Sequence, residues 1–190
     1  MYPIKNDVPL LIDIMKRAKS IQNSKITYAI VRTIKNLSEE KERIEEATAP
    51  GEDFLEYEKE FEALKIKYAV KKKDGEPQLL QKEENGKTVL SYRIEDKEGF
   101  IAEMEDLDLK YKQARVNFKE KEKSNKEFLN QPLDPVLFWN IDWDDVKDLS
   151  LKGGEFLAVA LLLKQKITFD MIPADTSGDV MEVLMHFFDI

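Results

Sequence analysis

Apolar residues recur at steps of three and four in two highly charged stretches, Glu52–Tyr68 and Lys97–Phe128. This spacing places each apolar set on one side of an α-helix. The two sets are Phe54, Tyr57, Phe61, Leu64 and Tyr68, and Phe100, Met104, Leu107, Tyr111, Ala114 and Phe118. Because turn signals separate the stretches, the sequence predicts an antiparallel, coiled-coil-like helical hairpin closed by a small β-element.

The segment between the two helices, Val70 to Ile94, predicts a two- or three-stranded meander. Asp74-Gly75 and Asn85-Gly86 are dipeptides that supply positive φ in tight turns, and Thr88–Tyr92 has the composition of a strand. A sheet this small is marginally stable alone, so we expect a helix or a partner to cover one of its faces.

Two helices are expected before the hairpin, the second beginning at about Ser24. Thr48-Ala49-Pro50-Gly51 interrupts the helical pattern, because proline disfavours helix in the preceding residue. The pattern leaves open whether residues 24–47 and 53–68 form two helices or one bent helix. Four acidic residues are expected to cap helices: Asp7, Asp53, Asp96 and Asp179.

The last third of the chain carries a stretch that is apolar almost all round, from Lys152 to Lys164. Such a helix is typical of a buried core. We expect a strand or an extended anchor over Val136–Ile141, a strand over Ile167–Ile172, and a final helix after Asp179.

These elements predict a mainly α-helical fold with a minor β-hairpin or meander, in which the charged helical hairpin projects from a helical core. The expected domains are residues 1–47 (N-terminal helices), 48–131 (the hairpin, with a β-tip at about 70–94) and 132–190. The last is an acidic region that we expect to pack with the N-terminal helices.

Composition narrows the possible chemistry. Charged residues make up 36% of the 190 residues, while hydrophobic residues make up 42%, which favours a folded chain with elongated, solvated helices over disorder. The absence of cysteine excludes disulfides, zinc–thiolate sites and thiol catalysis. We expect no signal peptide, no cofactor and no membrane association, since the longest apolar run, Phe156–Leu163, is too short to span a bilayer.

The net charge of −8 is unevenly distributed. Residues 1–37 carry seven Lys/Arg against two Asp, for +5, whereas residues 132–190 carry four against eleven acidic residues, for −7. An overall acidic balance argues against non-specific nucleic-acid binding. The two charged parts are expected to dock on each other or to attract different partners.

The acidic cluster Asp142, Asp144, Asp145 and Asp148 is a candidate for a hard cation or for partner binding. Its spacing fails the calcium-loop pattern, because Val146 and Lys147 occupy ligand and glycine positions, and helix capping is the simpler interpretation.

Two other candidates for chemistry are weaker. His186 is the lone histidine and has no evident catalytic or metal-ligating neighbour, so a packed or surface role is favoured. Lys152-Gly153-Gly154-Glu155 lacks the spacing of a phosphate-binding loop.

A basic patch, Lys71-Lys72-Lys73 with Tyr92, is the second candidate for partner binding. Lysines beside aromatic rings can hold single-stranded nucleic acid. Acidic residues flank this patch, however, and lysine on an exposed strand commonly guards against edge pairing, which is the favoured interpretation here.

The order of segments resembles an uncharacterised family of small bacteriophage-encoded helical proteins. The residues that carry the resemblance are Ile26-Thr27-Tyr28-Ala29-Ile30-Val31-Arg32, Tyr68-Ala69-Val70-Lys71-Lys72-Lys73-Asp74-Gly75, Trp139-Asn140-Ile141-Asp142-Trp143 and Leu149-Ser150-Leu151. It covers roughly residues 4–163 and departs at the Pro50-Gly51 break, in the length of the second charged helix and after Lys164. It implies a phage origin, with activity in the cytoplasm of an infected bacterium or in a virion, and it transfers no catalytic or binding residue.

Three functions follow as hypotheses. The first is a non-enzymatic phage protein that binds a protein partner or a second copy through its helical stripes. The second is an inhibitor of a host defence or nucleic-acid enzyme that uses the acidic surface. A metal-dependent enzyme ranks last, because no catalytic constellation is apparent.

Overall fold

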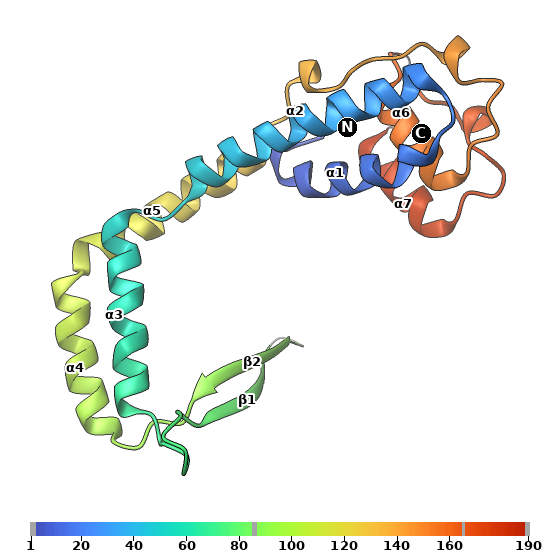
Figure 1. The fold of residues 1–190 in the computed structure, drawn as a ribbon. Helices are drawn as coiled ribbons and strands as arrows, with labels where there is room; N and C mark the ends of the chain where they lie inside the picture. Colours follow the sequence, from blue (N-terminus) through green and yellow to red (C-terminus); the bar gives the residue numbers. More distant parts are fainter. Residues whose placement is uncertain (1–2, 85–86, 165, 189–190) are drawn as a thin grey trace. The chain divides into compact units, whose positions relative to one another are not determined.

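The fold is mainly α-helical with one small antiparallel sheet, as the spacing of apolar residues predicted (Figure 1). The structure is a computed structural model, and it describes residues 3–84, 87–164 and 166–188. The chain divides into two compact units. Unit 1 consists of the residues up to Thr48 together with those from Ser124 onward, and unit 2 is Ala49–Lys123.

Unit 1 is built around a buried helix. Its helices are α1 (Val8–Arg17), α2 (Ser24–Thr48), α6 (Gly153–Leu162) and α7 (Gly178–Phe187), with the 3₁₀ turns η1 (Lys5–Asp7), η2 (Ala18–Ser20), η3 (Pro135–Leu137), η4 (Trp143–Asp145) and η5 (Phe169–Met171). α6 is buried on nearly every side because its sequence provides no polar face. Leu11 of α1, Ile30 of α2 and Leu184 of α7 belong to the same apolar cluster. This confirms the predicted core helix.

Unit 2 is the charged hairpin. It contains α3 (Glu52–Tyr68), β1 (Leu79–Glu84), β2 (Lys87–Tyr92), α4 (Lys97–Lys110) and the start of α5 (Lys112–Leu129), whose last residues belong to unit 1. α3 and α4 lie side by side (Figure 1). The two strands pair antiparallel, with Leu79 opposite Tyr92, and a bridge between Ala69 and Ile94 joins the sheet to the helix ends.

The helix breaks differ in how well the sequence signals them. The Pro50-Gly51 break separates two helices, since α2 ends at Thr48 and α3 begins at Glu52. The prediction of one uninterrupted helix over Lys97–Phe128 is wrong, because Tyr111 (φ −105°, ψ 21°) divides this stretch into α4 and α5. No proline or glycine lies at that break, and the Tyr111 N–H still donates to the Leu107 carbonyl at 3.0 Å.

Neither stretch considered as a strand in the last third forms one. At Val136–Ile141 the Asp134 carboxylate accepts from the Val136 N–H at 2.9 Å and starts η3, and only Ile141 makes a bridge, with Leu163. At Ile167–Ile172 the chain forms η5. Short apolar runs do not distinguish a strand from a buried turn.

One of the four expected caps is confirmed. The Asp96 carboxylate accepts from the Gly99 N–H at 2.9 Å and caps α4. Asp7 lies at the N-cap position of α1, as expected, but its carboxylate accepts from the Ile4 N–H at 2.8 Å and not from the helix. The expectations for Asp53 and Asp179 are wrong, because Gly51 and Ser177 precede α3 and α7 and leave these two residues in the first turns.

Candidate functional site

The seam between α3 and the α4–α5 side of unit 2 is lined by aromatic rings from both predicted stripes. The rings of Phe54 and Phe118 stack with their centroids 3.7 Å apart, and Tyr57 meets Tyr111 edge-on at 5.9 Å. Phe100 continues the row beside Phe61 and Tyr68. The stripes therefore pack on each other within unit 2, which was one of their two expected roles.

Carboxylates hold the tyrosine hydroxyls along this seam. The Tyr68 hydroxyl donates to Glu103 at 2.7 Å and the Tyr111 hydroxyl donates to Glu60 at 2.9 Å. Lys67 lowers the pKa of Glu103 most strongly, with Tyr68 second, and Lys110 and Tyr111 do the same for Glu60. The same hydrogen bonds raise the pKa of each tyrosine. This arrangement stabilises charged glutamates and neutral tyrosines near pH 7.

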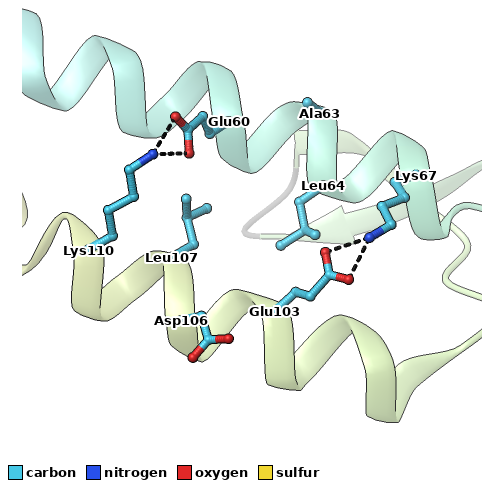
Figure 2. Close-up of a pocket in the computed structure, with 8 residues that line it drawn as sticks. All are labelled: Glu60, Ala63, Leu64, Lys67, Glu103, Asp106, Leu107 and Lys110. Atoms are coloured by element: carbon cyan, nitrogen blue, oxygen red, sulfur yellow. Dashed lines mark hydrogen bonds and ion pairs between the residues drawn. The ribbon is translucent and has the colours of Figure 1, made fainter.

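A shallow groove of about 440 Å³ lies between α3 and α4 (Figure 2). Its apolar floor is formed by Ala63, Leu64 and Leu107. Ion pairs bridge the helices at its two ends, with Lys110 Nζ 2.7 Å from Glu60 Oε1 and Lys67 Nζ 2.7 Å from Glu103 Oε2 (Figure 2). Four of its charged groups, Glu60, Lys67, Glu103 and Lys110, form the ion pairs that join the two helices. The groove is therefore part of the interface between α3 and α4.

Unit 2 buries little apolar surface and exposes much. Among its described residues only Leu64, Ala69 and Leu107 are buried apolar residues. Eight other apolar side chains are more than a third exposed: Leu55, Ile66, Leu79, Leu80, Leu90, Ile101, Leu109 and Val116. The extreme is Leu109, which is 70% exposed. These eight residues define the exposed apolar surface of unit 2, and exposed apolar side chains of this kind are candidates for contact with another chain.

The lysines of the predicted basic patch are exposed, but Tyr92 is engaged elsewhere. Lys71, Lys72 and Lys73 border a turn in which Gly75 has φ +86°, and Lys72 lies 3.7 Å from Glu76. The Tyr92 hydroxyl donates to Glu62 of α3 at 2.8 Å. The expected Asn85-Gly86 turn lies outside the described residues.

Lysines pair with most of the predicted acidic cluster. Asp142 lies 3.1 Å from Lys164, Asp144 lies 2.7 Å from Lys147 and Asp145 lies 2.6 Å from Lys25. The hydrogen bond from Lys25 is the main cause of the lowered pKa of Asp145. Asp148 is exposed. Within the described part of the chain, no three acidic or histidine side chains converge as metal ligands would.

His186 and the glycine pair of α6 take structural positions. The His186 Nε2 atom lies 3.4 Å from Asp7 Oδ1, and its ring packs edge-on against Phe187. At the start of α6, the Glu155 carboxylate accepts from the Lys152 N–H at 3.0 Å and also from Ser20. The Glu155 carboxylate therefore satisfies the N–H of the residue that precedes α6.

Unit 1 exposes a small aromatic cluster that the sequence analysis did not identify as a site. The Tyr28 and Trp139 rings meet edge-on at 5.4 Å, and the Arg32 guanidinium lies 5.6 Å from the Trp139 ring centre. Tyr28 is 52% exposed. The sequence does contain an indication of this cluster. Two large apolar residues, Tyr28 and Val31, lie on the outer side of the second helix, whose inner side already carries a complete stripe of apolar residues.

Within the described residues, no helix combines the length and apolar character that crossing a bilayer requires. No protein-family model, no curated protein and no solved structure matches this chain.

Proposed function

We propose that the protein is non-enzymatic and acts by binding another protein chain through unit 2. The observation that carries this proposal is the exposed apolar surface of unit 2, compared with only three buried apolar residues in the described part of that unit. Leu79 and Leu90 share one face of the hairpin, because Leu90 lies opposite Gln81, two residues along the strand from Leu79. Both leucines are about half exposed. A two-stranded hairpin with such a face gains stability from a covering partner.

The biological setting of this proposal comes from the resemblance alone. A phage-encoded protein of this kind would act in the cytoplasm of an infected bacterium or as part of a virion. The alternative function, an acidic surface that occupies a nucleic-acid groove, draws less support, because lysines neutralise Asp142, Asp144 and Asp145.

Site-specific photo-crosslinking tests the proposal. A photoreactive amino acid at Leu55, Leu90 or Leu109 should give a covalent product with a defined protein when the tagged chain is expressed in its host cell. Phe169 of unit 1 is a matched control, since it is 65% exposed but lies outside unit 2. Products from Phe169 with none from the three unit 2 positions would contradict the proposal.

A further inference from the structure

The exposed rings of unit 1 lie together with an arginine on one surface, which we call the aromatic–arginine cluster. It consists of Tyr28, Val31, Arg32 and Trp139. The first three share the outer side of α2, since Val31 and Arg32 follow Tyr28 at steps of three and four. Val31 is 50% exposed and Trp139 is 44% exposed. Tryptophan, tyrosine and arginine are the residues that most often dominate the energy of a protein–protein contact.

Hydrogen bonds to α2 hold the segment that carries Trp139. The Thr33 hydroxyl oxygen accepts from the Trp139 N–H at 2.9 Å, and the Asn36 side-chain amide donates to the Leu137 carbonyl at 3.1 Å. These bonds tie the backbone of residues 137–139 to α2, so the cluster is already formed in the free protein. A preformed surface loses less conformational entropy when it binds.

The charge of Arg32 has no carboxylate partner among the residues that the structure describes. The Arg32 guanidinium lies 5.6 Å from the centre of the Trp139 ring, and its Nε atom is buried without a hydrogen-bond partner. The side chain as a whole is only partly exposed. A partly buried cation without a partner is unfavourable, so a carboxylate brought in from outside would stabilise this site.

Two other occupants fit the cluster less well. A second copy of the cluster, related by a two-fold axis, would bring two unpaired Arg32 side chains to one interface, where like charges repel. A single-stranded nucleic acid needs several cations along its backbone in addition to stacking rings. The nearest lysines along α2 do not supply them, because Lys25 pairs with Asp145 and Lys35 pairs with Glu39.

We propose that the aromatic–arginine cluster binds an acidic peptide segment of another protein, in which a carboxylate adjoins an apolar side chain. The carboxylate pairs with the Arg32 guanidinium, and the apolar side chain lies against the Tyr28 and Trp139 rings. One segment thus supplies the missing counter-charge and covers the exposed rings. This surface lies in unit 1, so the inference is independent of the proposed function of unit 2.

Selection from a random peptide display library on the immobilised full chain tests the inference. The enriched peptides should carry Asp or Glu close to an apolar residue, and the Tyr28→Ala variant should not retain them. The same selection on Arg32→Glu should enrich peptides with Lys or Arg in place of the acidic residue. A variant that failed to fold could not produce such a switch of preference.

Calorimetric titration of the most enriched peptide measures the two kinds of contact. Arg32→Gln should weaken binding about tenfold, and so should replacement of the peptide carboxylate by an amide. Because both changes remove one ion pair, the two together should cost little more than either alone. Tyr28→Ala should weaken binding about thirtyfold through loss of the ring contact. Lys16→Gln removes the same charge from an exposed position of α1 and should leave the affinity unchanged.

Three outcomes of the selection would overturn the inference: no peptide that distinguishes the wild-type protein from Tyr28→Ala, enriched peptides without an acidic residue, or the same acidic peptides on Arg32→Glu. A fluorescently labelled oligothymidylate is the remaining probe. If it binds and Tyr28→Ala abolishes the binding, the cluster belongs to nucleic acid instead. Far-UV circular dichroism should show the same helix content for all variants. The crosslinks from unit 2 decide the proposed function separately.

Discussion

At the scale of single residues, the first turn of α4 depends on the absence of a side chain at Gly99. Its N–H donates to the capping Asp96 carboxylate at 2.9 Å. A Cβ at this position would collide with Asp96 Oδ2 and lie 3.0 Å from Tyr68 Cε1. The close approach of the cap and the tyrosine ring thus explains a glycine in a helix, where it is normally unfavourable.

Gly99→Ala and Gly154→Ala should therefore have opposite effects on the free energy of unfolding. Gly154 also lies in the first turn of a helix, but nothing is within 4 Å of its Cβ position. Gly154→Ala should raise the free energy by about 0.5 kcal/mol, because alanine restricts the unfolded chain. Gly99→Ala should lower it by about 1 kcal/mol through loss of the cap. Urea unfolding measures both, and a gain in Gly99→Ala would contradict the steric account.

Thr33 is a fully buried polar residue in the core of unit 1, where its hydroxyl oxygen accepts from the Trp139 N–H at 2.9 Å. Thr33→Val should lower the free energy of unfolding by about 1 kcal/mol, because it removes the acceptor of the part-buried Trp139 backbone N–H. It should also change the tryptophan fluorescence of the folded protein. Thr33→Ser keeps the acceptor and is the matched control, and equal losses in both variants would assign the effect to packing instead.

At the scale of elements, the pairing of α3 with α4 should depend on pH. The folded-state pKa values of Glu60 and Glu103 lie below the ordinary glutamate value of about 4.3. Their contribution to stability is therefore complete above about pH 4.3 and is lost as the pH falls through the lowered folded-state values. The thermal midpoint should fall over that acidic range, as followed by circular dichroism.

A double variant, Glu60→Gln/Glu103→Gln, provides the control for this pH effect. It removes the two titrating groups but keeps side chains of similar size, so its midpoint should vary less between pH 3 and 5, a range bracketing the ordinary value of about 4.3. An unchanged slope would show that other carboxylates carry the acid sensitivity.

Elements with a strong periodic pattern could be predicted from the sequence, and elements decided by distant contacts could not. The stripes through Leu64 and Leu107 specify the hairpin because the spacing alone selects one helix side. The break at Tyr111 could not be predicted from the sequence, because no proline or glycine lies there. The acidic cluster likewise gave no sign that Lys25 and Lys164 would neutralise Asp145 and Asp142, because those pairs form only when separate segments fold together.

At the scale of the whole molecule, the two units differ in how much apolar surface they bury. Unit 1 contains the large apolar cluster around α6, whereas the described part of unit 2 contains three buried apolar residues. Because burial of apolar area is the main stabilising contribution, local opening should cost less in unit 2.

Peptide-resolved hydrogen exchange should reveal this difference. Amides of α6 should exchange most slowly, and those of α3 and β2 considerably faster. Uniform protection across both units would contradict the difference in burial.

The two ion pairs across the groove also select the register of the hairpin. As exposed pairs they add little to the stability of the native hairpin. If α4 slid by seven residues in one direction, Glu60 would face Glu103, and in the other direction Lys67 would face Lys110. Since apolar residues repeat at nearly that interval, the seam alone would tolerate such slippage. The charges penalise both misaligned hairpins, so they act against misfolding more than they strengthen the native state.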